Sequence, residues 1–82
     1  MFVSHDGDEL TIRLNAFRHA ADTLTVRLEG AREPVASIPV ALEPLELFET
    51  TVRVPSGVAF RVRLPRLELD YASDPGERLL SR

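Results

Sequence analysis

The sequence repeats a short pattern in which an arginine stands between two aliphatic residues. The pattern occurs at residues 12–14, 26–28, 52–54 and 60–64. Successive side chains of a β-strand point to opposite faces, so each occurrence describes a strand with one apolar and one polar face. Several such strands in a chain of 82 residues predict an all-β domain in which each sheet has a core on one side.

Turn-forming residues divide the chain into roughly six to seven short strands. The expected strands cover residues 2–4, 10–15, 23–29, 35–42, 51–54, 59–64 and 67–71. Residues 16–21 predict a loop or a single helical turn, which is too short for a crossover helix, so the sheets should be antiparallel. We therefore expect a small antiparallel β-sandwich or a partly open barrel. Residues 1–82 form one domain, with 73–82 a frayed tail or a short last strand.

Proline and glycine give three more local predictions. Pro39 removes a backbone donor from the middle of residues 35–42, which places that strand at a sheet edge. The Pro55-Ser56-Gly57 turn predicts an antiparallel hairpin between residues 51–54 and 59–64. Within residues 45–54 the apolar alternation changes phase, which predicts a β-bulge.

The alternation also predicts which apolar side chains form the core. The residues expected to be largely buried are Leu14, Leu24, Val26, Leu28, Val52, Val54, Phe60, Val62, Leu64, Leu69 and Tyr71. Of the aromatic residues, Phe2, Phe17 and Phe48 also lie mostly in core phase. Single-strand nucleic-acid binders expose aromatic rings on a basic face, so this phase argues against that class.

Composition and charge limit the classes of partner and the cellular location that we expect for the protein. The chain has no cysteine, and its ten basic residues are all arginine. A net charge of −3 argues against non-specific binding to nucleic acid or to anionic membranes. No apolar run is long enough to span a membrane, and the first residues lack the features of a secretory signal. We therefore expect a cytoplasmic protein.

The arginines of the repeated pattern are the candidate binding residues. If their strands are neighbours, they share one polar face; they are Arg13, Arg27, Arg53, Arg61 and Arg63. Such a face could bind phosphates or carboxylates in bidentate fashion. It could equally be a solvated surface built from cross-strand ion pairs with Glu29, Glu49, Glu68 and Asp70.

Motifs for catalysis or for cofactor binding are absent from the sequence. No serine stands in a Gly-x-Ser-x-Gly elbow, and the four glycines are scattered singly rather than forming a phosphate loop. His5 and His19 lack the spacing of metal ligands and are expected to be solvent-exposed or in loops. These observations predict a protein without enzymatic activity, metal or cofactor.

The function expected from the sequence is a non-catalytic binding or assembly module that works through a sheet edge or face. Unprotected edge strands invite pairing, and so small a domain gains stability from a partner. We expect a homo-oligomer or a protein partner at residues 35–48. The edge residues expected in the contact are Val35, Ile38, Val40, Leu42 and Phe48. The alternatives are an anion- or ligand-binding domain that uses the arginine face, and an accessory domain of an enzyme on another chain.

Overall fold

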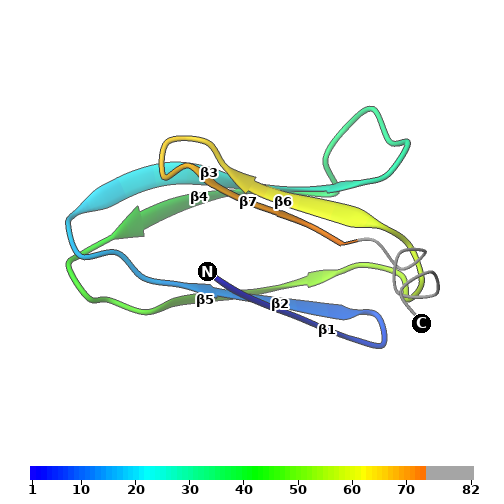
Figure 1. Ribbon diagram of the computed structural model, residues 1–82, viewed down its shortest axis with the longest axis horizontal. Helices are drawn as coiled ribbons and strands as arrows, with labels where there is room; N and C mark the ends of the chain where they lie inside the picture. The colour runs from blue at the N-terminus through cyan, green and yellow to red at the C-terminus, as the bar shows by residue number, and fades with distance from the viewer. Residues whose placement is uncertain (74–82) are drawn as a thin grey trace, which may run out of the picture.

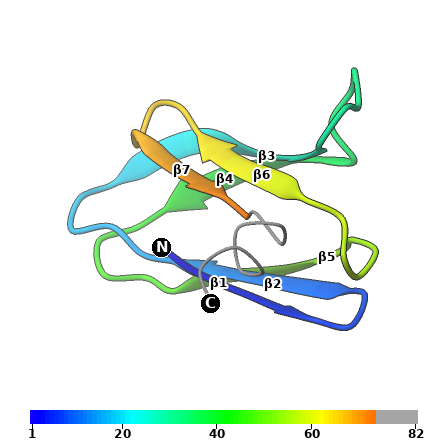
Figure 2. The same cartoon turned by 45° about the vertical axis from the view of Figure 1, so that its right-hand side comes forward.

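Residues 1–73, the part of the chain that we describe from a computed structural model, form seven antiparallel strands in two sheets (Figures 1 and 2). The strands are β1 (Phe2–Asp6), β2 (Glu9–Leu14), β3 (Ala20–Leu28), β4 (Ala36–Leu42), β5 (Phe48–Arg53), β6 (Phe60–Leu64) and β7 (Leu69–Ala72). One sheet has the order β1-β2-β5 and the other β4-β3-β6-β7. This confirms the expected all-β class. The two sheets face each other and do not close into a barrel.

Hairpins join consecutive strands within each sheet. Gly7, with φ of +59°, occupies the first position of the two-residue turn between β1 and β2, where glycine meets the required positive φ without strain. Strands β3 and β4 pair from Ala20 opposite Leu42 to Val26 opposite Ala36. Strand β4 lies at the edge of its sheet, as Pro39 predicts.

The predicted hairpin at Pro55-Ser56-Gly57 is wrong. Strand β5 pairs with β2 in the three-stranded sheet, whereas β6 pairs with β3 and β7 in the other. The Val54 N–H donates to the Asp8 carbonyl at 2.9 Å, so the chain leaves β5 still attached to the three-stranded sheet. A turn does form there, with Gly57 at φ of +83°, but it belongs to a connection that crosses between the sheets. Crossing places β5 and β6 in opposite sheets, on either side of the core.

The predicted bulge is also wrong, and the predicted loop at residues 16–21 is confirmed except for its last two residues. The β2–β5 pairing runs without interruption from Glu9 opposite Arg53 to Leu14 opposite Phe48, so β5 contains no bulge. Of residues 16–21, the first four form a loop, and Ala20 and Ala21 already belong to β3. The predicted last strand or frayed tail falls almost entirely on residues 74–82, outside the described part of the chain.

Among residues 1–73, eleven buried apolar side chains form the core between the sheets. They are Leu10, Ile12, Leu14, Leu24, Val26, Val40, Leu42, Val54, Phe60, Val62 and Leu64. Seven of these were predicted; the expected Leu28, Val52 and Leu69 are only half-buried. Tyr71 was wrongly assigned to the core, because β7 is an edge strand that leaves this side chain 37% exposed beside Phe60.

Candidate binding surfaces

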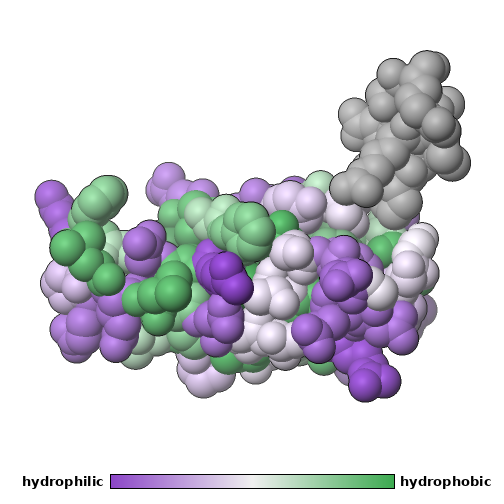
Figure 3. Space-filling model, turned by 90° about the horizontal axis from the view of Figure 1, so that it is seen from below, coloured by the Kyte–Doolittle hydropathy of each residue, from purple (hydrophilic) through white to green (hydrophobic). Residues whose placement is uncertain are grey.

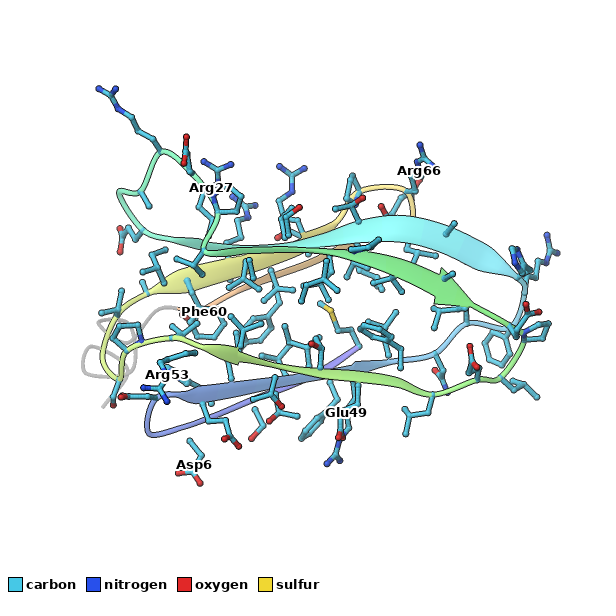
Figure 4. The ribbon with its side chains drawn as sticks, turned by 180° about the vertical axis from the view of Figure 1, so that it is seen from behind. Asp6, Arg27, Glu49, Arg53, Phe60 and Arg66 are labelled. Carbon is cyan, nitrogen blue, oxygen red and sulfur yellow. The ribbon has the colours of Figure 1, made fainter. Side chains whose placement is uncertain are left out.

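The five arginines do not share one face. Arg27, Arg61 and Arg63 project from the outer face of the four-stranded sheet. Arg13 and Arg53 lie on the outer face of the three-stranded sheet, on the opposite side of the molecule (Figure 4). Each was correctly expected to be exposed, but alternation along a strand cannot reveal which sheet the strand joins. Any arginine surface therefore has at most three of the five predicted members.

On the four-stranded sheet, one carboxylate serves two arginines. Arg61 donates to both oxygens of Asp70, with Nε–Oδ1 and Nη2–Oδ2 distances of 2.9 and 2.8 Å. Arg63 Nε lies 4.0 Å from the same carboxylate. The hydrogen bond from Arg61 lowers the pKa of Asp70, and the same bond raises the pKa of Arg61 above its ordinary value. This is one of the cross-strand ion pairs expected if the arginines belong to a solvated sheet surface.

Arg27 stands directly opposite Arg61 in the β3–β6 register. Its Nη1 donates to the Arg32 carbonyl at 2.5 Å, and within residues 1–73 it forms no ion pair at 4.0 Å or less. Beside Arg27 and Arg61 opens a hollow of about 490 Å³, lined also by the apolar Phe60 and the acidic Glu29. Two like charges facing each other across a sheet are unfavourable, so this corner could accept an anion.

On the outer face of the three-stranded sheet, each arginine lies opposite a glutamate of a neighbouring strand. Arg13 forms an ion pair with Glu49, which lies opposite it on β5, and its guanidinium lies 5.7 Å from the centre of the Phe2 ring. Arg53 lies opposite Glu9 in the register. The alternation of sign across these strands is that of a solvated sheet surface.

Only some of the residues expected in the edge contact are accessible to a partner. Val40 and Leu42 are 3% and 1% exposed, because their inward phase on β4 places them in the core, so neither is available to a partner. Val35 is 46% exposed, and Ile38 and Phe48 are partly buried. Ile38 lies on β4, Val35 precedes that strand and Phe48 begins β5, and Figure 4, seen from behind, brings these two strands to the front.

Of the described residues, the most exposed apolar side chains lie on two loops at one end of the sandwich. We call residues 15–19, which connect β2 to β3, and residues 43–47, which connect β4 to β5, the loop tip (Figure 1). Here Phe17 is 88% exposed, Leu45 68% and Leu47 64%. Apolar side chains gather at this end of the face seen in Figure 3.

Sequence reasoning missed the loop tip. It assigned Phe17 mostly to core phase and treated residues 45–54 as a strand region with a bulge. The available signal was the absence of strand periodicity around Phe17, together with the break at Glu43-Pro44. The phase assigned to Phe2 was also wrong: the side chain points outward from β1 and is 56% exposed.

The two histidines differ in environment. His19 is an exposed loop residue, as expected, with Nε2 3.8 Å from Glu43 Oε1. His5 was wrongly expected to be exposed or in a loop: it is half-buried on β1, where Nε2 lies 2.8 Å from the Val54 carbonyl oxygen and the ring meets the Phe60 ring edge-on. Residues 1–73 contain no group of three or more histidine, aspartate or glutamate side chains placed to bind a metal.

Comparison with known protein families, curated proteins and solved structures found no match. Residues 1–73 include no helix with the length and apolar character needed to cross a membrane. The candidate surfaces must therefore be interpreted from their own chemistry.

Proposed function

We propose that the protein is a non-catalytic assembly module that associates with further copies of itself through the side of the sandwich formed by β4 and β5. The observation that carries this proposal is the distribution of exposed apolar side chains. Val35, Leu45 and Leu47 are each between 46% and 68% exposed, and all three lie on β4, its flanks or the loop that leads to β5. Exposed apolar surface of this kind is typical of protein contacts.

The edge position of β4 supports the same proposal. An edge strand presents backbone groups that have no partner strand, and proteins either protect or use them. Pro39 limits how far a second strand can pair with β4. We therefore infer a contact made by side chains beside the edge rather than by a continuous sheet across two copies.

Sedimentation velocity tests the assembly. We expect the wild-type protein to pass from monomer to a larger species between about 1 and about 100 µM, because association depends on concentration. Val35→Lys places a charge in the contact and should weaken association. The matched control is Thr51→Lys, exposed on the outer face of the three-stranded sheet, which should leave association unchanged. A monomer at every concentration would contradict self-assembly and favour a partner-dependent adaptor.

Anion binding is the second candidate, and the facing pair Arg27 and Arg61 favours it. A phosphate or carboxylate beside these groups would accept hydrogen bonds from Arg27 and from Nη1 of Arg61, whose Nε and Nη2 already donate to Asp70. Titration with inorganic phosphate, followed by the arginine side-chain resonances in NMR spectra, tests this site. Arg27→Gln should abolish the shifts, whereas Arg53→Gln, on the other sheet, should not. Equal shifts in both variants would contradict a specific site.

A further inference from the structure

The loop tip is held as one unit by contacts between its two loops. The Leu45 N–H donates to the Ala16 carbonyl at 2.8 Å, and His19 lies near Glu43. Within the second loop, the Glu46 N–H donates to the Glu43 carbonyl at 3.0 Å, and the Glu46 carboxylate accepts from the Glu43 N–H at 3.2 Å. The exposed apolar side chains of the tip are thus presented by an ordered scaffold.

Leu45 has a strained backbone conformation within this scaffold. Its φ is +63°, in the left-handed region that usually selects glycine or asparagine. A leucine in this conformation is strained, and here its side chain is 68% exposed, so it recovers little burial in the isolated chain. Backbone strain that persists at an exposed position points to a functional constraint. At the loop tip that constraint is an apolar side chain that a glycine could not supply.

The basic and the acidic side chains around the apolar residues lie on different loops of the tip. The first loop carries Arg18 and His19, and the second carries Glu43 and Glu46; all four residues are exposed. A two-fold axis through the tip, perpendicular to the line that joins the two loops, would bring the basic loop of each copy against the acidic loop of the other. A two-fold interface requires this kind of self-complementary patch, in which residue i meets j and j meets i.

We infer that the loop tip is a two-fold dimerisation surface, and that its occupant is the loop tip of a second copy of this chain. Phe17, Leu45 and Leu47 form the apolar centre of the contact, and Arg18 of each copy faces Glu46 of the other at the rim. This inference rests on the proposed self-assembly and assigns the loop tip, whose second loop lies between β4 and β5, as a contact of its own beyond the β4 edge. The charge complementarity of the two loops selects a second copy over an unrelated partner.

The decisive experiment uses two charge reversals, alone and mixed. R18E and E46R each create like-charge contacts across the two-fold axis, so each should weaken homodimerisation by about tenfold or more. In an equimolar mixture, however, the introduced acid of one variant faces the introduced base of the other, and the two remaining natural side chains also attract. We therefore expect a heterodimer about as tight as the wild-type dimer. Sedimentation velocity with one variant fluorescently labelled measures all three affinities.

Two further variants make the result specific. R32E is the matched control, because Arg32 is exposed at the opposite end of β3, and it should leave the dimer unchanged. L45G removes the apolar side chain and the backbone strain together. It should weaken the dimer while the melting temperature of the dilute monomer stays the same or rises, so that the loss cannot be attributed to unfolding.

The outcomes separate this inference from the proposed function. If the wild-type protein dimerises but R18E, E46R and L45G dimerise equally well, the loop-tip inference is overturned and assembly through β4 stands, as Val35→Lys would show. If both charge variants weaken dimerisation but their mixture does not recover it, the two-fold arrangement is overturned. If the wild-type protein stays monomeric, both proposals are overturned.

Discussion

The carboxylate of Asp22 accepts a hydrogen bond from the backbone N–H of Leu67 at 2.9 Å. The other carboxylate oxygen accepts from the Thr23 N–H at 2.7 Å. Among residues 1–73, Asp22 is the only buried charged residue, with 8% of its surface exposed. It points inward near the start of β3. It thereby ties the first residues of β3 to the turn between β6 and β7.

Replacing Asp22 should therefore destabilise the fold. Asp22→Ala leaves the Leu67 N–H without its partner in a half-buried site, and we expect a loss of about 1–3 kcal/mol in the free energy of unfolding. Asp22→Asn retains one acceptor oxygen and should lose less. Urea denaturation measures both, with Asp6→Asn, exposed on β1, as the control. Equal stability of Asp22→Ala and wild type would contradict the structural role of this carboxylate.

Leu64 tests the phase of the core. Its side chain is fully buried at the end of β6, so Leu64→Ala should lower the free energy of unfolding by about 2–4 kcal/mol through lost burial and a cavity. A domain of this size has only about 5 kcal/mol of stability in total, which would leave the variant marginally folded. Val35→Ala, at a 46% exposed position, should have little effect. A thermal unfolding curve of Leu64→Ala that matches the wild type would mean that the core phase is assigned backwards.

The Arg61–Asp70 pair should give a small, acid-sensitive contribution to stability. Because the pKa of Asp70 is lowered in the folded protein, chiefly by the hydrogen bond from Arg61, this contribution is complete above pH about 4, the ordinary pKa of aspartate. It is lost as the pH falls through the lower pKa of the folded state. The stability difference between wild type and Asp70→Asn should therefore shrink as the pH falls below about 4.

The NMR titration of Asp70 gives the direct measurement. Its carboxyl resonance should titrate below the pKa of an unfolded aspartate, and Arg61→Gln should raise that pKa. Arg53→Gln, on the other sheet, is the matched control and should leave it unchanged. An unchanged Asp70 pKa in Arg61→Gln would show that the pair does not persist in solution.

Glu68 offers a stabilising substitution. It has a φ of +55° in the turn between β6 and β7, where its N–H donates to the Pro65 carbonyl at 3.2 Å. Glycine adopts this conformation without strain, although it loses more entropy on folding. We expect Glu68→Gly to leave the protein equally stable or to raise its stability by up to about 1 kcal/mol. Glu68→Val, whose β-branched side chain tolerates positive φ poorly, should instead lower the melting temperature.

The sequence alone determined the class of the fold and the local phase of most strands. Alternation is a property of neighbouring residues, so the inward positions of Leu24, Val26 and Val62 could be predicted without knowing any long-range contact. Pro39 likewise fixed the edge position of β4, because a missing backbone donor cannot be accommodated in a central strand.

Only the tertiary structure decided which sheet each strand joins. The Pro55-Ser56-Gly57 turn has the residues of a hairpin, yet β5 pairs with β2 and β6 pairs with β3 in the opposite sheet, so long-range pairing prevailed over the local turn preference. The same division separated Arg13 and Arg53 from Arg27, Arg61 and Arg63. It also brought Phe17 and Leu45, far apart in the chain, to one end of the sandwich. Strand pairing depends on long-range packing, and alternation along a single strand carries no information about it.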